Sequence, residues 1–200
     1  SLANKMYKSF TYKLITKLGM NISHDEYHDI SFFRAMSIAL IGFRNALLLK
    51  YCMYSVLLSV FNYRVIRPYL WKKMGCALGK NVFIGYNVWF DYNNANLIKI
   101  GDNVHITNMC LLLCHQRDID NYLIGNNSSK LPYKKGKIII ENGVMIGMNS
   151  TIMPGVKIGE GSIVGAKSLV LEDVPPWTIV AGNPAKVIKK IKNKDEYTNL

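Results

Sequence analysis

Apolar side chains recur at every sixth position between Leu78 and Pro175. Eleven hexads are visible, and their first residue is aliphatic in ten cases and Phe90 in the other. Glycine fills the second position in six hexads, and Asn, Gly or Asp fills the fourth in nine. A helix repeats every 3.6 residues and a strand every two, so neither explains a period of six. The hexads are LGKNVF, IGYNVW and FDYNNA (78–95), IGDNVH and ITNMCL (100–111), and IENGVM, IGMNST, IMPGVK, IGEGSI, VGAKSL and VLEDVP (140–175).

A short strand followed by a tight corner accounts for this period, because Asn, Gly and Asp tolerate a left-handed backbone at the corner. Three hexads then close one coil of a parallel β-helix, with positions 1 and 5 pointing inward and position 6 outward. Successive coils stack at about 4.8 Å, the spacing between neighbouring strands. We therefore predict a mainly β fold, a single-stranded parallel β-helix with three hexads per coil over residues 78–191.

Two insertions interrupt the repeat, and insertions in a solenoid leave it as loops. The short one spans residues 96–99 and the long one about 112–139. The long insertion is rich in ionisable and polar side chains, so we predict that this loop carries the functional residues. It contains four lysines together with His115, Arg117, Asp118, Asp120, Tyr122 and Tyr133.

The flanking segments lack the sixfold period. Residues 1–77 predict an N-terminal helical extension, with an amphipathic helix over 5–18 and one or two apolar helices over 32–71 that Pro68 ends or kinks. Towards the other end, Gly182-Asn183-Pro184 predicts a turn and 185–191 a short basic C-terminal helix. Residues 192–200 read as a polar tail.

The net charge of +12 is concentrated at the two ends of the chain. Residues 1–77 hold 11 basic and 3 acidic side chains, 78–185 hold 9 and 8, and 186–200 hold 5 and 2. Nucleic-acid binding would need a basic folded surface and a recognition motif, and neither is found, so we expect no nucleic-acid partner. The extension is expected either to pack on the β-helix or a neighbouring subunit, or to touch the inner face of a membrane.

A transmembrane helix is not expected, because the most apolar window, 51–63, offers only 13 uncharged residues where a span needs about 20. The four cysteines form no CxxC pair, and no secretory signal is recognised, so we expect a reduced, cytoplasmic chain. Only two histidines lie beyond residue 30, and no metal site is expected.

The run GMNSTIMPGVKIGEGSIVGAKSLVLEDVPPWTIVAGNPAKVIKKI (147–191) resembles the C-terminal part of the hexapeptide-repeat acyltransferases, a family that includes bacterial sugar and polysaccharide O-acetyltransferases. ANLIKIGDNVHIT (95–107) resembles the coil before the catalytic loop of that family. The resemblance implies a left-handed β-helix, a homotrimer with active sites between neighbouring subunits, and acetyl-CoA as donor. It also implies a loop histidine as base, and His115 stands at the matching position.

Chemistry leads to the same histidine. Acetyl transfer from a thioester to an alcohol needs a base with a pKa near neutrality and then an acid for the departing thiolate, and imidazole serves as both. His24 and His28 lie in the polar hinge of the extension, and His105 is at an outward sixth position, so structural or solvated roles are expected for them. His115 lies at the mouth of the long insertion. Its neighbour Cys114 could act as a nucleophile, but direct transfer needs no acyl-enzyme and Cys is a common small core residue.

The orienting partner of His115 is left open between Asp118, Glu141 and a backbone carbonyl. The family tends to place acceptor-binding polar groups near Asp91 and Asn93, although an Asx residue at a corner is often only a turn former. For the donor, the resemblance points to the later coils and the basic end of the chain. The matching residues are Gly147, Ala166, Lys167, Asn183, Pro184 and Lys186.

One departure affects the donor site, because this chain has Leu171-Glu172 where many members have Thr-Lys. A carboxylate there weakens the expected phosphate contacts, for which Lys167, Lys186, Lys189 or Lys190 would compensate.

The leading hypothesis is an acetyl-CoA-dependent O-acetyltransferase acting on a sugar hydroxyl in surface polysaccharide synthesis. The alternatives are N-acetylation of a nucleotide-linked amino sugar, a non-catalytic β-helix scaffold, and a metal-dependent hydratase of the gamma carbonic anhydrase type. The hydratase needs three histidine ligands, and the repeats offer only His105 and His115.

Overall fold

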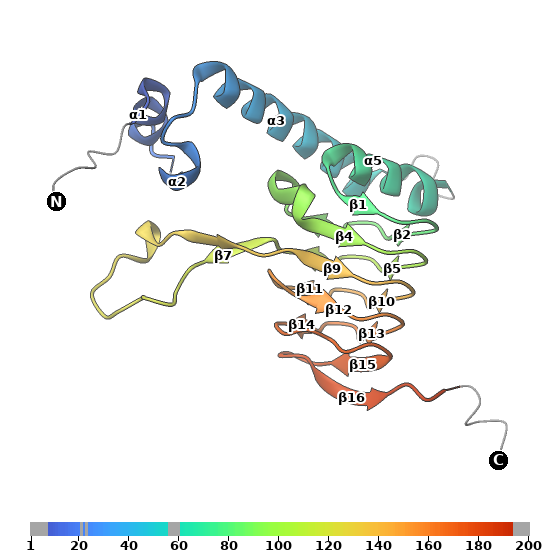
Figure 1. The fold of residues 1–200 in the computed structure, drawn as a ribbon. Coiled ribbons are helices and arrows are strands. Elements are labelled where there is room, and N and C mark those ends of the chain that lie inside the picture. The colour runs from blue at the N-terminus through green and yellow to red at the C-terminus, as the bar shows by residue number, and fades with distance from the viewer. Residues whose placement is uncertain (1–7, 21, 23, 56–60, 194–200) are drawn as a thin grey trace, which may run out of the picture. The chain divides into compact units, whose positions relative to one another are not determined.

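The computed structural model describes residues 8–20, 22, 24–55 and 61–193. The expected polar tail from residue 194 and the start of the first predicted helix, including Lys5, lie outside these ranges. Among the described residues, the α-helices and one π-helix precede the strands along the chain (Figure 1). They are α1 (Phe10–Lys17), α2 (His24–Tyr27), α3 (Phe32–Tyr54), the π-helix η1 (Asn62–Ile66) and α5 (Arg67–Met74).

Contacts divide the described chain into two compact units. One holds the residues up to Arg44 together with 117–134, and the other holds 45–116 and the residues from Lys135 onward. The division therefore falls before the expected boundary at residue 77. The reason is that Leu49, Cys52 and Trp71 are buried in the same hydrophobic core as the strands.

The strands of the second unit stack as a parallel β-helix, which confirms the predicted architecture (Figure 1). Each coil contributes one strand to each of three sheets, which we call A (β1-β4-β9-β12), B (β2-β5-β10-β13-β15) and C (β3-β6-β11-β14). The strands are β1 (Ala77–Leu78), β2 (Phe83–Ile84), β3 (Trp89–Phe90), β4 (Ile98–Ile100), β5 (His105–Ile106), β6 (Leu111–Leu112), β9 (Ile138–Ile140), β10 (Met145–Ile146), β11 (Thr151–Ile152), β12 (Lys157–Ile158), β13 (Ile163–Val164), β14 (Leu169–Val170) and β15 (Thr178–Ala181).

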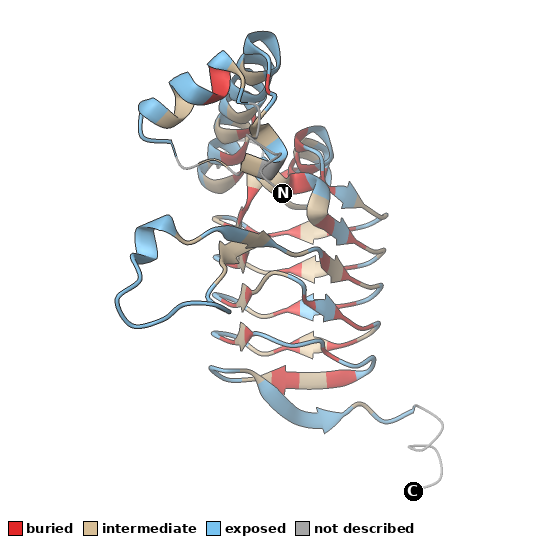
Figure 2. Ribbon diagram, turned by 60° about the vertical axis from the view of Figure 1, so that its left-hand side comes forward, coloured by how far each residue is buried: buried red, intermediate tan, exposed pale blue. Residues whose placement is uncertain are grey.

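The interior of the β-helix is built from positions 1 and 5 of the hexads, as the pattern predicts. In sheet B, Ile84, Ile106 and Ile146 form a column of residues at most 1% exposed. The preceding residues Phe83 and His105 point outward and are half-buried. Figure 2 shows these buried positions recurring from coil to coil, so the repeat encodes a continuous aliphatic core.

Two backbone requirements explain the other repeat positions. The fourth position has a positive φ in most hexads, including Asn103 at 57° and also Met109 at 61°. The second position is glycine where the next coil passes very close. A Cβ on Gly147 would lie 2.5 Å from the backbone nitrogen of Ala166, which is nearer than real contacts allow. The second-position glycines therefore set the distance between coils.

Helix α5 covers the first coil. Trp71 is fully buried, and its ring lies 4.1 Å from that of Phe90, the one aromatic residue at a first hexad position. Such a cap removes the open apolar end that a solenoid would otherwise expose. Pro68 does not end a helix as expected but lies in the first turn of α5, directly after the π-helix η1.

The expected C-terminal helix is wrong. After the predicted turn at 182–184, residues Lys186–Lys190 form strand β16, which pairs antiparallel with β15. Val187 and Ile188 favour a strand, and the free edge of β15 supplies hydrogen-bonding groups that outweigh the helix propensity of the lysines.

The long insertion is shorter than expected, because Leu112 and Ile138 belong to strands of the β-helix and are fully buried. Its two arms, β7 (His115–Arg117) and β8 (Tyr133–Lys135), form a two-stranded sheet, and the short helix η3 (Ser128–Lys130) lies between them. The short insertion is divided between two elements: residues 96 and 97 end the 3-10 helix η2 (Tyr92–Leu97), and residues 98 and 99 belong to β4.

Within the described residues, α3 is the one helix long and apolar enough to cross a membrane, with a mean hydropathy of 1.5 over its most apolar 18 residues. The sequence expectation did not recognise it, because that expectation rested on the window at 51–63. The second half of α3 packs on the β-helix through Leu49 and Cys52, and the amide of Asn45 donates to the carbonyl of Met74 at 3.2 Å. These contacts commit that half of the helix to the protein core.

Candidate active site

Asp91 and His115 meet at the corner where sheet C leads into sheet A. Asp91 follows β3 and His115 follows β6, and these two strands are neighbours in sheet C. The backbone N–H of Asp91 donates to the carbonyl of Leu112 at 3.1 Å, which fixes the register of the corner. Two residues that are 24 positions apart in the chain therefore become neighbours.

His115 Nδ1 is hydrogen-bonded to Asp91 Oδ2. The Asp91 side chain is 4% exposed and that of His115 is 35% exposed, so the carboxylate is enclosed while the imidazole reaches the surface. An ionised carboxylate only accepts hydrogen bonds, so we assign the ring proton to Nδ1. This tautomer makes Nε2 the basic nitrogen of the ring, as a general base requires.

Asp91 is itself held by its surroundings. The side-chain amide of Asn94 donates to Asp91 Oδ2 at 2.8 Å, and the Asn94 backbone N–H donates to the Asp91 carbonyl at 2.9 Å. Asn94 lies in η2, the segment that breaks the hexad register. Asn94 was not among the residues predicted from the sequence. The register break itself was the available signal, because a corner that departs from the repeat must be held by contacts of its own.

Gly136 and Cys114 close the neck of the loop. The N–H of Gly136 donates to the carbonyl of Cys114 at 2.9 Å, directly before His115. A Cβ on Gly136 would lie 2.7 Å from the carbonyl carbon of Pro154 in the next coil, so only glycine fits there. The Cys114 side chain is fully buried, and burial, followed by the negative charge of Asp91, raises the pKa of its thiol to about 12. A buried neutral thiol is a poor nucleophile, which argues against an acyl-cysteine.

The other residues considered as partners or acceptor groups make different contacts. Glu141 lies at the corner between sheets A and B, where its carboxylate pairs with Lys157 Nζ at 2.8 Å. That hydrogen bond lowers the pKa of Glu141. Asp118 Oδ1 accepts from the backbone N–H of Asp120 at 3.1 Å within the loop. Asn93 is exposed beside Asn94. The structure thus brings Asp91, which the sequence predicts as an orienting or acceptor-binding residue, to His115 Nδ1.

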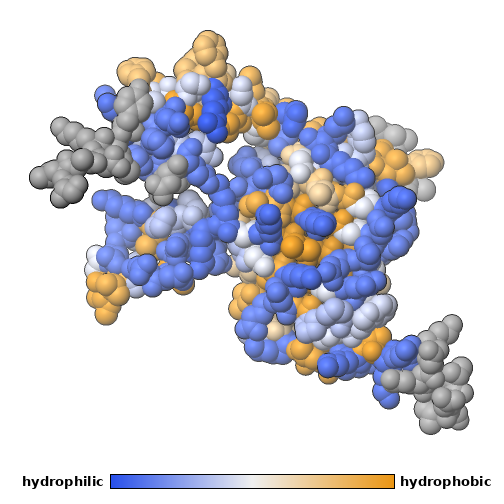
Figure 3. Space-filling model, viewed as in Figure 1, coloured by the Kyte–Doolittle hydropathy of each residue, from blue (hydrophilic) through white to orange (hydrophobic). Residues whose placement is uncertain are grey.

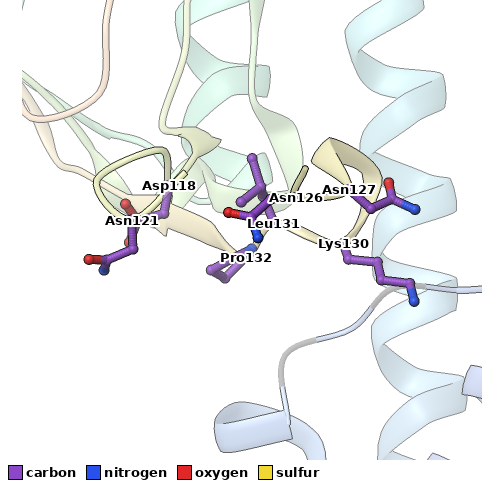
Figure 4. A pocket seen from close by; sticks show the side chains of 7 residues that line it. All are labelled: Asp118, Asn121, Asn126, Asn127, Lys130, Leu131 and Pro132. Carbon is purple, nitrogen blue, oxygen red and sulfur yellow. The ribbon is translucent and has the colours of Figure 1, made fainter. Parts of the chain in front are cut away.

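The loop carries a polar pocket of about 360 Å³ (Figure 4). Three side-chain amides, one carboxylate and one ammonium group contribute to its wall. The lining residues are Asp118, Asn121, Asn126, Asn127, Lys130, Leu131 and Pro132. The Arg117 guanidinium lies 4.0 Å from the centroid of the Tyr133 ring and donates to the carbonyl of Leu131, so the two arms of the loop are held together.

The residues expected to contact the donor gather at a different corner, between sheets B and C. Gly147 and Ala166 are neighbours in successive coils, and the N–H of Lys167 donates to the carbonyl of Met148 at 2.8 Å. The turn containing Asn183 and Pro184 continues this column. Two backbone hydrogen bonds join this turn to Leu169. The N–H of Ala185 donates to the Leu169 carbonyl, and the Leu169 N–H donates to the Gly182 carbonyl. Lys186 pairs with Ala181 in β15, and its side chain is exposed.

Two separate corners of one chain therefore carry the two groups of candidate residues. The His115–Asp91 pair lies between sheets C and A, and the Gly147–Lys186 group lies between sheets B and C. The remaining histidines make local contacts. His105 packs on Phe83 with ring centroids 4.0 Å apart, and His24 stacks on His28. Among the described residues, no group of three or more His, Cys, Asp or Glu side chains could hold a metal ion.

A β-helix built from hexads defines the chain as a hexapeptide-repeat protein. Consistently, residues 137–172 match the family model described as "Bacterial transferase hexapeptide (six repeats)". The chain is 34% identical to "Putative acetyltransferase YvoF" of Bacillus subtilis (strain 168) over 145 residues, which cover 72% of this chain and 75% of that protein. The chain belongs to the hexapeptide-repeat acetyltransferase family.

Two further similarities concern a sugar acetyltransferase. The chain is 35% identical to the galactoside O-acetyltransferase of Escherichia coli (strain K12) over 126 residues, 60% of each protein. A solved galactoside acetyltransferase in complex with coenzyme A superimposes with a TM-score of 0.61 at 25% identity, covering 88% of this chain and 94% of that one. This similarity implies the left-handed sense of the β-helix.

Proposed function

We propose that this protein transfers an acetyl group from acetyl-CoA directly to a sugar hydroxyl, with His115 as the general base. The observation that carries the proposal is the His115–Asp91 hydrogen bond at the mouth of the loop. It combines a surface-reaching imidazole with an enclosed carboxylate that orients it. The galactoside O-acetyltransferase relative supports the choice of a sugar hydroxyl as acceptor.

His115 carries the proton transfers of this reaction. Its Nε2 takes the proton of the acceptor hydroxyl as the oxygen attacks the thioester carbonyl, and the same nitrogen then protonates the departing thiolate. One C–O bond forms and one C–S bond breaks, so no acyl-enzyme is required. Asp91 positions the ring and stabilises the imidazolium that exists between the two proton transfers.

Acetyl-CoA is assigned to the corner between sheets B and C. Small residues at Gly147 and Ala166 leave a smooth wall for the pantetheine arm, and the exposed ammonium groups of Lys167 and Lys186 complement phosphates. The solved relative bound to coenzyme A supports this donor. Because acetyl-CoA is an intracellular metabolite, we place the enzyme in the cytoplasm.

We propose a homotrimer because the two corners are separated in one chain. A transfer reaction needs the base and the thioester within a few ångströms of each other. In one chain the His115–Asp91 pair and the proposed donor column lie on different edges of the prism. A neighbouring subunit would bring its donor edge to this base, so we propose three chains with active sites between them.

The loop pocket supports a hydroxyl-rich acceptor, because amide groups both donate to and accept from sugar hydroxyls. We propose a role in surface polysaccharide synthesis, where acceptors of this kind are assembled.

Thiol release from acetyl-CoA across a panel of sugars, nucleotide amino sugars and lipid-linked oligosaccharides tests the function. We expect release with a neutral sugar and a product that loses its acetyl group in mild alkali, as an ester does. A product stable to alkali would indicate N-acetylation, and no release with any acceptor, using folded protein that binds CoA, would favour a scaffold.

The donor assignment has its own test. Lys186→Glu should weaken CoA binding at least tenfold and dephospho-CoA binding much less, if this lysine meets the terminal phosphate. Lys99→Glu, on the outer side of sheet A, is the matched control and should leave both affinities unchanged. Equal weakening of both ligands by Lys186→Glu would remove this lysine from the phosphate site.

A further inference from the structure

Helix α3 carries an exposed apolar stripe that the proposed chemistry does not use. Its members are spaced by four, four, three and four residues, so they share one face of the helix. We call them the outer stripe: Phe32 (57% exposed), Met36 (46%), Leu40 (61%), Phe43 (65%) and Leu47 (53%). Apolar atoms are also visible at the surface of this helical part of the chain in Figure 3.

The outer stripe is not part of the core of the β-helix. At 100° per residue, it lies roughly 170° around the helix from the buried positions Asn45, Leu49 and Cys52. Those three residues already form the contact with the β-helix, and the amide of Asn45 also donates to the carbonyl of Tyr92 at 3.3 Å. Packing on the β-helix of the same chain therefore accounts for one face of α3, and the other face is left for a neighbouring subunit or a membrane.

A transmembrane orientation does not explain the stripe either. The stripe covers 16 residues, or about 24 Å of helix, whereas the hydrocarbon core of a bilayer is about 30 Å thick. The second half of α3 would also have to leave the core contacts of Leu49 and Cys52 in order to span. A stripe of this length is suited to lying along the plane of a membrane surface.

The charge of the surrounding residues indicates which kind of partner covers the stripe. Between Ile30 and Phe90 the chain has eight Lys and Arg residues and no Asp or Glu. Arg34, Arg44 and Lys50 lie on α3 itself and are exposed. Helix α1 repeats the combination, with Leu14 and Phe10 exposed and basic residues along the same helix. A second copy of α3 would bring the same positive charge and no carboxylate to pair with it, whereas anionic lipid headgroups would complement it.

We propose that the outer stripe docks the protein on the surface of a membrane containing anionic phospholipids, with α3 lying in the headgroup layer. The aromatic and aliphatic side chains of the stripe would enter the acyl boundary. Lys50 and Arg44, which lie nearer to the stripe around the helix than Arg34 does, would contact lipid phosphates. Docking is a property of α3 and stands whether or not the acceptor is a sugar. It would hold the active site close to lipid-linked substrates.

Sedimentation of the full-length protein with sucrose-loaded vesicles tests the proposal. The anionic vesicles contain phosphatidylcholine with about 30% phosphatidylglycerol. We expect the protein to bind them at least tenfold more strongly than vesicles of phosphatidylcholine alone, and the binding to weaken as the salt concentration increases. Equal binding to both vesicle types, or no binding at low salt, would overturn the proposal.

Matched variants of α3 assign the binding to the stripe. Leu40→Glu/Phe43→Glu places two carboxylates in the stripe and should lower binding to the anionic vesicles at least tenfold. Ile38→Glu/Ile41→Glu makes the same charge change on other sides of the helix, at positions that are 44% and 50% exposed, and should lower binding less than threefold. Similar losses in both variants would show that charge alone controls binding and would refute a role for the stripe.

Light scattering without vesicles distinguishes the other occupant. We expect the wild type and Leu40→Glu/Phe43→Glu to have the same molar mass. A smaller assembly in the variant would show that the stripe joins subunits, which would contradict membrane docking. Acetyl transfer to a soluble acceptor, measured on the same samples, reports on the proposed chemistry separately.

Discussion

Replacing Asp91 with Asn tests the link between the buried carboxylate and the imidazole. The two side chains have nearly the same shape, and the Asp91 carboxylate accepts hydrogen bonds from His115 Nδ1 and from Asn94 Nδ2. In either orientation the amide of Asp91→Asn lacks the negative charge that stabilises an imidazolium. In one orientation its NH₂ group also faces Nδ1 and forces the ring proton onto Nε2, which blocks the base.

The expected loss is about 10²–10⁴-fold in turnover, or about 3–5 kcal/mol of transition-state stabilisation. Because the substitution conserves volume and loses one charge-assisted hydrogen bond, the fold should lose at most about 3 kcal/mol. Thiol release at saturating acetyl-CoA and acceptor measures turnover, and circular dichroism checks the fold. The KM for acetyl-CoA should not change, because Asp91 positions the base and does not contact the proposed donor corner.

Asn96→Ala is the matched control for Asp91→Asn. Asn96 lies in the 3-10 helix η2 that follows Asp91 and is exposed, so turnover should stay within threefold of the wild type. If Asp91→Asn also kept turnover within threefold while folding normally, the carboxylate would have no part in orienting His115.

Three further substitutions test the fold and its titratable groups. In a denaturant titration, Gly147→Ala should destabilise the β-helix by more than about 2 kcal/mol, because its Cβ would meet the next coil at 2.5 Å. Gly155→Ala is the control: its Cβ meets nothing within 4 Å, and it should cost only about 1–2 kcal/mol because φ is positive there. Burial lowers the pKa of His105, so the unfolded chain binds this proton before the folded protein does as the pH falls below about 6.5, and the free energy of unfolding decreases there. His105→Gln should therefore reduce the slope of unfolding free energy against pH between about pH 7 and 5. An unchanged slope would contradict a role for His105. Cys114→Ala should keep turnover within about fivefold of the wild type, because a thiol with a pKa of about 12 stays protonated and is a poor nucleophile. A loss as large as that expected for a missing general base would support an acyl-cysteine intermediate.

The β-helix could be predicted because every hexad reports the same local geometry. Inward positions, outward positions and corners all follow from residue type, and the later unbroken hexads left no ambiguity in register. Even so, residue type was not a complete guide at the corners. Met109 and Lys167 adopt a positive φ that stacking imposes on them, whereas the fourth-position residue Asn93 lies in a 3-10 helix instead.

The pairing of Asp91 with His115 was harder to predict, because it depends on the path of an irregular corner. Adding one coil of 18 residues and the four-residue insertion aligns Asp91 with Leu113, and the pairing in sheet C agrees with this alignment. His115 is two residues further on, and only the turn of the chain at Cys114 brings its ring back to the carboxylate. Sequence spacing therefore predicts that the two residues lie in adjacent coils, but it does not predict that their side chains are in contact.

The C-terminal segment shows a different limit of sequence analysis. Lys186–Lys190 has local features of a basic helix, but β15 ends the solenoid with an open edge, and an antiparallel strand satisfies that edge. The choice depends on a partner strand that a local window does not contain.

The most direct measurement for the central claim is the single-turnover rate of acetyl transfer from labelled acetyl-CoA to the acceptor, compared between the wild type and His115→Ala. If His115 is the base, the variant should bind acetyl-CoA with unchanged affinity and transfer the label about 10²–10⁴-fold more slowly. Transfer at close to the wild-type rate by the folded variant would show that another group removes the proton and would contradict the account.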